Sequence, residues 1–311
     1  MKALVVPTNR EDAIKAFLKA WEPVKDWDIT IIIEDHAQKS FDLGVDHHYS
    51  WSEINDDLGE NSWIISNQDS AIRCYGFLQA YRMGAEYIFS LDDDCYPCTL
   101  PWCQEHIKRL SSTPKWTESI LGQRTRGLPY DNRGILDNVM FNVGLWTGIP
   151  DFDSVQSLGC IVPNDFEPPA YDRIIPKGQY VPICGMNLAF KREATPLCYF
   201  PLMGTSSPFS RFDDIWFGVI AKKICDHLGW HISVGRPFIE HIRMSDKFDN
   251  LVKEAPGIKF NEEFWEIIDK IELTSKTPHG CMLEIGNKMD HTSIYISQLG
   301  WTIRLWANLF S

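Results

Sequence analysis

The chain has 311 residues, 44% of them hydrophobic, which is enough apolar material for the core of one large or two ordinary domains. Its 30 basic and 42 acidic residues give a net charge of −12, which argues against extended binding along a nucleic-acid backbone. The sequence has no run of the roughly 18–20 apolar residues that a membrane span needs, and the apolar run in the opening MKALVVPTNR is too short for a signal peptide.

The N-terminal third alternates between short apolar runs and amphipathic segments. Residues 3–6 predict a strand that Pro7 and the two residues after it interrupt. Residues 14–21 carry apolar side chains at i, i+3, i+4 and i+7, which is one face of a helix. Residues 29–33 form a β-branched run typical of a strand buried on both faces. Further elements predicted here are a strand over 63–66, a helix from 69 to about 83 and a strand over 87–91.

The rest of the chain is less regular. Residues 112–180 are rich in Gly, Pro and Asp, and we interpret them as strands and loops that cover a site. Residues 213–228 predict a helix that ends at Gly229, and residues 294–310 predict a terminal helix that packs on the core or on another subunit. Strands that alternate with helices indicate a doubly wound, mostly parallel α/β sheet. We expect one domain over 1–270 and a helical extension over 271–311.

Acidic residues follow two of the predicted strands. Asp35 comes just after the run 29–33, and Asp92, Asp93 and Asp94 come directly after the run 87–91. Parallel α/β sheets bind their ligands at the carboxyl ends of the strands. No G-x-G-x-x-G follows the first strand, so we expect neither NAD nor a flavin as cofactor.

Three adjacent carboxylates repel one another and resist burial unless a cation neutralises them. In an extended chain Asp92 and Asp94 share one face and Asp93 points to the other. Such a D-x-D pair suits Mg²⁺ or Mn²⁺, which prefers oxygen ligands and keeps positions for the diphosphate of a nucleotide sugar. The alternative interpretation is a solvated acidic turn.

Two other features fit the same kind of site. Asp213 and Asp214 lie at a predicted helix start, where the helix dipole favours carboxylates, so capping alone also explains them. His241 follows the strand-like run RPFIEH and is either a further metal ligand or a structural residue.

Nine cysteines in a chain without a signal peptide favour reduced thiols and a cytoplasmic location. Cys95 and Cys98 have the CxxC spacing of a zinc site, and Cys103 is close in sequence. No second CxxC or close pair of histidines completes a tetrahedral set. Buried or incidental thiols are therefore the favoured interpretation.

Many blocks of the sequence, in the same order, resemble the reversibly glycosylated polypeptide family, whose best-known members are plant UDP-arabinopyranose mutases. The resemblance runs from about residue 4 to about residue 265 and includes VPTNR, SNQDSAIRCYGF, FSLDDDC, RGLPYDNRG, IPKGQYVPICGMNLAF and RFDDIWFGVIAKKICDHLG. It implies a glycosyltransferase-A-like fold, a divalent metal, a UDP-sugar substrate and a homo- or hetero-oligomer of family members. The tail after about residue 270 is outside the resemblance.

The resemblance also implies roles for single residues. In this family an arginine of the stretch RG-x-P-x-x-x-R becomes reversibly glycosylated, and the motif here begins at Arg126 and ends at Arg133. Paired arginines also suit a phosphate clamp. Because arginine stays protonated, Arg126 is expected either to accept the sugar or to stabilise an intermediate. Asp213 and Asp214 are expected to hold sugar hydroxyls or a catalytic proton. Binding of the nucleotide sugar is expected from Pro7, Thr8, Arg10, Asp35, Asp69, Arg73, Asp92, Asp93 and Asn187, and metal binding from Asp92, Asp94 and His241.

The function that we expect is a metal-dependent, flavin-free mutase that interconverts pyranose and furanose forms of UDP-arabinose. One alternative is a glycosyltransferase that moves the sugar onto itself, or onto a protein, glycan or modified base. A second alternative is a non-catalytic subunit of a glycosyltransferase complex, against which the Asp triplet and both arginines argue.

Overall fold

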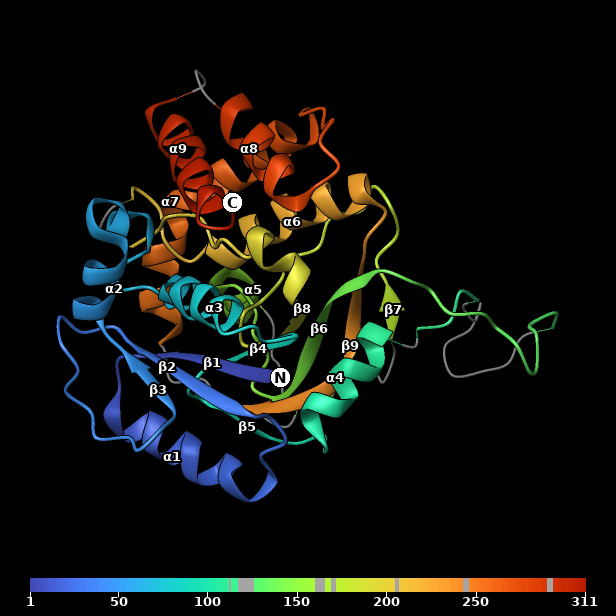
Figure 1. Ribbon diagram of the computed structural model, residues 1–311, viewed down its shortest axis with the longest axis horizontal. Coiled ribbons are helices and arrows are strands. Elements are labelled where there is room, and N and C mark those ends of the chain that lie inside the picture. Colours follow the sequence, from blue (N-terminus) through green and yellow to red (C-terminus); the bar gives the residue numbers. More distant parts are fainter. Residues whose placement is uncertain are drawn as a thin grey trace.

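A computed structural model of the chain describes residues 1–111, 113–116, 126–159, 166–168, 172–204, 207–242, 246–289 and 293–311. Through this part runs a nine-stranded sheet in the order β3-β2-β1-β4-β8-β6-β9-β5, with β7 paired to β9 (Figure 1). Six of the nine strands run in one direction, because only β5, β7 and β8 are antiparallel to their neighbours. The strands are β1 Lys2–Thr8, β2 Ile29–Glu34, β3 His47–Tyr49, β4 Tyr87–Leu91, β5 Cys95–Pro97, β6 Val139–Gly148, β7 Arg173–Ile174, β8 Asn187–Lys191 and β9 His231–His241.

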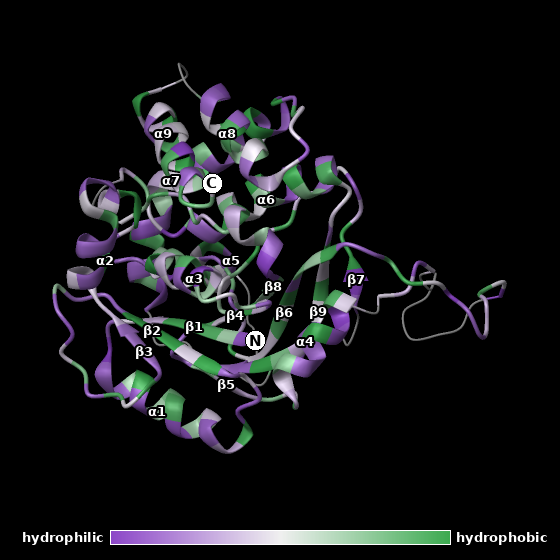
Figure 2. Ribbon diagram, in the orientation of Figure 1, coloured by the Kyte–Doolittle hydropathy of each residue, from purple (hydrophilic) through white to green (hydrophobic). Residues whose placement is uncertain are grey.

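Helices cover both faces of the sheet, which confirms the predicted doubly wound α/β class. Ile31 and Ile33 of β2 point into one apolar core and Ile32 into the other, as expected for a strand buried on both faces. Coloured by hydropathy, the strands are largely apolar and the helices alternate between polar and apolar residues (Figure 2). The helices are α1 Glu11–Trp21, α2 Trp51–Leu58, α3 Arg73–Arg82, α4 Trp102–Ser111, α5 Ser154–Gly159, α6 Asp213–Leu228, α7 Lys247–Asp269, α8 Pro278–Lys288 and α9 Ile294–Asn308.

Two local predictions were wrong. Residues 63–66 form no strand, because the 3₁₀ helix Gly59–Ile64 includes the first two of them and a bend follows it. The helix packs Trp63 against Trp301 of α9 at 4.8 Å between ring centroids. A short apolar run cannot distinguish a strand from a buried turn. Pro7 does not interrupt β1 either, since it pairs with Ile33 of β2. Pairing of β1 with β4 ends at Val5, so Pro7 lies where the strand has one neighbour.

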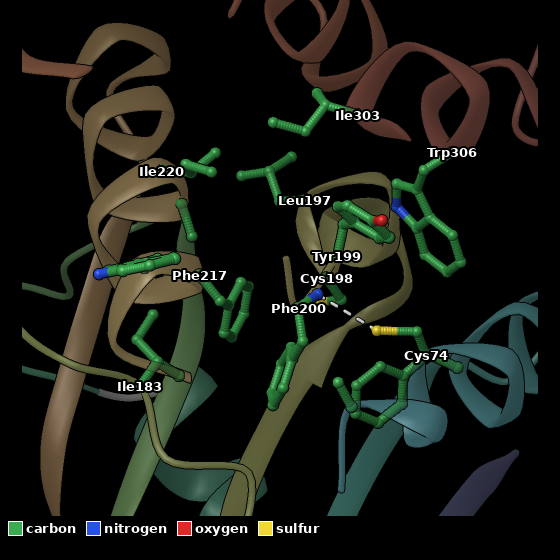
Figure 3. Close-up of a cluster of buried hydrophobic side chains, with 14 of the residues drawn as sticks. Cys74, Ile183, Leu197, Cys198, Tyr199, Phe200, Phe217, Ile220, Ile303 and Trp306 are labelled. Atoms are coloured by element: carbon green, nitrogen blue, oxygen red, sulfur yellow. Dashed lines mark hydrogen bonds between the residues drawn. The ribbon is translucent and has the colours of Figure 1, made fainter. Parts of the chain in front are cut away.

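The C-terminal helices pack on the core of the same chain, as predicted for residues 294–310. Ile303 and Trp306 of α9 lie over the segment that carries Leu197 and Tyr199 (Figure 3). The rings of Tyr199 and Trp306 stack at 5.5 Å, and Trp306 Nε1 donates a hydrogen bond to the Pro196 carbonyl oxygen at 3.0 Å. The tail therefore shares the larger core with α3, α6 and the sheet.

Close approach of α3 to β1 depends on Gly76. A Cβ atom at this position would lie 2.4 Å from Val5 Cγ1 and 3.2 Å from Ile33 Cγ1. Gly→Ala within a helix normally stabilises by roughly 0.5–1 kcal/mol, but overpacking a core costs roughly 1–3 kcal/mol. We expect Gly76→Ala to lower the free energy of unfolding by about 1 kcal/mol or more, as measured by urea denaturation.

The matched control is Gly159→Ala in α5, where a Cβ atom would meet nothing within 4 Å. That substitution should leave the stability unchanged or raise it slightly. Equal stability of the two variants would mean that α3 can move away from β1 without cost.

Candidate functional site

A large cavity lies at the carboxyl ends of β1, β2 and β4, where the sequence predicts a ligand site. Its volume is about 1240 Å³, and α5, α7 and the start of α6 form the opposite walls. The cavity is slightly larger than the roughly 300–1,000 Å³ of most small-molecule sites. Predicted site residues that line it are Pro7, Thr8, Arg10, Asp35, Asp69, Arg73, Asp92, Asp93, Asp94, Asp213, Asp214 and His241.

Arg73, at the start of α3, is a buried cation in the cavity wall. Its guanidinium donates to the Ser70 and Gly185 carbonyl oxygens and to Ser90 Oγ, and it forms an ion pair with Asp92. Burial, the largest single cause, opposes the charged form, but the charge and hydrogen bond of Asp92, together with further negative charge nearby, raise the pKa of Arg73. Arg73 therefore holds one member of the Asp triplet.

The Asp triplet forms a turn and not an extended segment, which corrects the predicted alternation of its side chains. The Cys95 N–H bonds back to the Asp92 carbonyl oxygen at 3.2 Å. Asp93 accepts a hydrogen bond from Thr8 Oγ1 at 2.6 Å and forms an ion pair with Arg10, which also lies 3.5 Å from Asp94. Asp93 thus joins β1 to β4, while Asp92 and Asp94 face different partners.

Asp94 and His241 face each other across the cavity wall. His241 Nδ1 lies 2.7 Å from the Ile149 carbonyl oxygen, which can only accept, so Nδ1 carries the proton. The other ring nitrogen, Nε2, is 4.0 Å from Asp94 Oδ1. Burial first, and then the neighbouring Asp92 carboxylate, raise the pKa of Asp94 to about 6.

The three predicted metal ligands do not form one cluster. Asp94 and His241 lie together, whereas Asp92 is bonded by Arg73. Within the described ranges, no three His, Cys, Asp or Glu side chains are arranged to hold a metal ion on their own. The cysteines considered for zinc do not form a metal site among the described residues either, since Cys95 and Cys103 are buried and Cys98 is exposed.

A second group of carboxylates lies at the start of α6, which begins at Asp213 as predicted. Burial first, and then Asp69, raise the pKa of Asp213 well above its usual range. Burial also raises the pKa of Asp214, to about 7, with Asp151 as the next cause. At neutral pH Asp214 can therefore both give and take a proton.

Asp151 and Cys184 line the same part of the cavity and were missed by the sequence analysis. The Cys184 thiol donates to Asp151 Oδ2 at 3.4 Å and also lies close to Asp214. Burial and then Asp151 raise the pKa of Cys184, so it stays a thiol and is no nucleophile. Asp151 follows β6 as Asp92 follows β4, which is the signal that could have revealed it. Nothing in the sequence marks Cys184.

Asp35 lies at the end of β2, as predicted, and is held there by its neighbours. Its carboxylate accepts a hydrogen bond from Trp51 Nε1 at 2.7 Å. Burial is the main cause that raises its pKa. The Asp35 carboxylate lines the cavity and is close to the backbone of Gln68 and Asp69.

Asn187 does not reach the cavity, which corrects the prediction that it binds the nucleotide sugar. Its Oδ1 accepts from Trp102 Nε1 at 3.1 Å and lies 3.0 Å from His106 Nε2. Its Nδ2 donates to the carbonyl oxygens of Leu145 and Pro237. With all its hydrogen-bonding positions used, Asn187 joins β8, β6, β9 and α4 in the interior.

Arg126 and Arg133 also lie outside the cavity. They belong to the segment between α4 and β6, which projects away from the rest of the chain (Figure 1). β6 runs in the same direction as β4, because both are antiparallel to β8. The segment therefore meets the sheet at the amino ends of these strands, and the cavity lies at their carboxyl ends.

Comparison with known proteins gives a consistent result along the whole chain. The sequence profile of the family described as reversibly glycosylated polypeptide matches residues 3–310, including the tail that the sequence analysis left outside the resemblance. The chain is 35% identical to UDP-arabinopyranose mutase 3 of Arabidopsis thaliana over 306 residues, covering 91% of this chain and 82% of that protein. It is 36% identical to the probable UDP-arabinopyranose mutase 2 of Solanum tuberosum, covering 97% and 88%.

Among solved structures, one titled as the crystal structure of a mycobacterial protein aligns with a TM-score of 0.44 at 14% identity, covering 86% of this chain and 72% of that one. None of the helices in the described ranges has the length and apolar content to cross a bilayer.

The raised pKa of Asp214 makes stability depend on pH. The folded state binds the proton more tightly than the unfolded chain, so the stability contributed by protonated Asp214 is lost as the pH rises from the unfolded value of 3.8 to about 7. We expect Asp214→Asn to be more stable than the parent at pH 8 by at least about 1 kcal/mol, and to show no such gain near pH 4. Urea unfolding at the two pH values measures this difference.

The control is Asp56→Asn, which changes an exposed carboxylate on α2. Its effect should be small and nearly the same at both pH values. A gain for Asp214→Asn that is equal at pH 4 and pH 8 would contradict the assigned pKa.

Proposed function

The chain belongs to the reversibly glycosylated polypeptide family, and we propose that it interconverts the pyranose and furanose forms of UDP-arabinose. The observation that carries the proposal is the acidic cavity at the carboxyl ends of β1, β2 and β4, in a chain that is 33–36% identical to proteins named as UDP-arabinopyranose mutases. The second half of the proposal is a requirement for Mn²⁺ or Mg²⁺.

The residues at the cavity wall fit a divalent cation. His241 keeps Nε2 free because Nδ1–H is donated to Ile149, which is the second-shell arrangement of many metal-bound histidines. Nε2 and Asp94 Oδ1 are 4.0 Å apart, close to twice the roughly 2.1 Å of one metal–ligand bond. Asp94 and His241 would hold the ion, with water and substrate oxygens as the other ligands. A bound ion supplies positive charge that stabilises the diphosphate as it leaves the sugar.

The remaining residues divide between binding and proton transfer. We assign Asp35 to the uridine, and Arg10 to the diphosphate, since its side chain is partly exposed beside Asp93 and Asp94. Exchange of the ring oxygen requires that one sugar hydroxyl loses a proton and another oxygen gains one. Asp214 and Asp151 suit this transfer, because both carboxyls lie beside the Cys184 thiol in the same corner of the cavity.

The decisive test is an incubation without any acceptor. Purified protein, with Mn²⁺ and either UDP-arabinofuranose or UDP-arabinopyranose, should give the same mixture of both ring forms from either side. Chromatography of the nucleotide sugars measures it. If the protein only hydrolyses the donor, or works only after an acceptor is added, a glycosyltransferase is the correct assignment.

The metal assignment has its own test. Asp94→Asn should lower kcat by at least about a hundredfold and remove the Mn²⁺ dependence of UDP binding, because a neutral amide is a poorer ligand for a hard cation. EDTA should reproduce the effect on the parent protein. Calorimetric titration with UDP, with and without Mn²⁺, separates binding from turnover.

The matched control is Asp42→Asn, which changes an exposed carboxylate outside the cavity and should behave like the parent. Full activity of the parent in EDTA would refute the requirement for a metal.

A further inference from the structure

The segment between α4 and β6 carries exposed groups on a projecting stem. We call its described residues, 113–116 and 126–136, the arm. Its base is closed by the Leu136 N–H bond to the Thr113 carbonyl oxygen at 2.7 Å. Beyond the base, Trp116, Tyr130 and Ile135 expose 51%, 79% and 54% of their surface. Isolated apolar side chains on a surface are common, but three on one projecting stem are typical of a protein contact.

Two helices that contribute to the cavity wall carry further exposed apolar side chains. Val155 and Leu158 on α5, and Phe248, Val252 and Ile258 on α7, are all exposed, and we call them the rim patch. The two helices pack against each other, and the Ser154 N–H on α5 bonds Glu254 on α7. Val155 and Ile258 also line the cavity. Part of the rim patch therefore lies directly beside the acidic site.

The charge of the cavity is also unbalanced. Among the described residues that line it, eleven are Asp or Glu and four are Arg or Lys. Two of those four cations, Arg10 and Arg73, are already bonded to Asp93 and Asp92. A nucleoside diphosphate sugar adds further negative charge. The site thus attracts positive groups from outside. The arm carries the exposed Arg126 and the partly exposed Arg133, which donates to the Pro129 carbonyl oxygen at 3.3 Å.

The arm cannot supply these arginines to the cavity of its own chain, since it leaves the sheet at the opposite strand ends. We propose that the arm of a second copy of this chain docks on the rim patch and delivers Arg126 to the cavity, so that each complete active site is shared by two chains. The proposal deepens the proposed function, and its catalytic half rests on it. In a symmetric dimer, the arm of each chain reaches the cavity of the other, so both cavities receive an Arg126.

Complementation of two inactive variants tests the shared site. Arg126→Ala removes the arginine and Asp94→Asn disables the cavity. Each variant alone should lose activity. Pairs that contain one chain of each, purified through two different tags, hold one intact cavity beside one intact arm. They should recover about half of the parent activity, because one of two sites is whole. If the arm served its own cavity, neither chain of the pair would have both an intact cavity and an intact Arg126. A pair that is as inactive as the two single variants therefore overturns the proposal.

A second measurement does not depend on activity. Chains with Tyr130→Cys and chains with Val252→Cys are mixed and treated with a short bifunctional thiol reagent. Both positions are exposed, so neither change should disturb folding. A covalent dimer should form in the mixture well above the level seen with either variant alone or with the parent, whose exposed Cys98 sets the background. No dimer above background refutes docking, whatever the enzyme activity.

The two measurements separate the possible failures. Cross-linking without mutase activity in the parent would overturn the proposed function and leave the docking intact. A parent protein that is fully active as a monomer, or an Arg126→Ala variant with parent activity, would overturn the shared site.

Discussion

The buried guanidinium of Arg73 is the interaction on which the site depends. It is 1% exposed and joins the start of α3, Ser90 of β4, the carbonyl of Gly185 and the carboxylate of Asp92. A Cβ atom on residue 185 would lie 2.6 Å from its Nη1, so glycine is needed for the chain to approach. Leaving a fully buried charge without its partner typically costs about 3–5 kcal/mol, and the cost here is smaller because the Asp92 side chain is 32% exposed. Arg73 therefore fixes both the position of the Asp triplet and the wall that carries Cys184.

Around this fixed cation the chain gathers more carboxylates than it can neutralise. Burial is the first cause that raises the pKa values of Asp69, Asp93, Asp94, Asp213 and Asp214, and neighbouring carboxylates add to it for each of them. Folding pays a free-energy cost for every one of these groups above its usual pKa. Such a cost is common where a site must bind a cation or move a proton. The same excess of negative charge thus supports both proposals, a metal beside His241 and a proton carrier at Asp214.

Features of the fold and the site that depend on neighbouring residues in the sequence could be predicted, and those that depend on distant residues could not. The strand Tyr87–Leu91 and the helix Asp213–Leu228 match their predicted bounds, because hydrophobic period, capping and the following turn all act within a few residues. Strand ends and a helix start marked Asp35, the Asp triplet, Asp213 and Asp214, and the resemblance to a family added Pro7, Thr8, Arg10, Asp69 and Arg73. The resemblance could not show that all the hydrogen bonds of Asn187 are made inside the protein. Nor could it show that the Asp triplet bends into a turn. Both features depend on partners that are distant in the sequence. The position of Arg126 could not be predicted either, because it depends on the direction in which β6 runs in the sheet.

The placement of the arginines also has a physical logic. An arginine buried in the wall of this cavity would be held by the surrounding carboxylates, as Arg73 is by Asp92. Its charge would then stabilise the fold and be of little use to a reacting sugar. An arginine carried on a separate segment meets the carboxylates and the substrate only on docking, so its charge is still available when the sugar–phosphate bond breaks. In the proposed shared site, the acidic cavity and an arginine supplied by a second chain are therefore two parts of one arrangement.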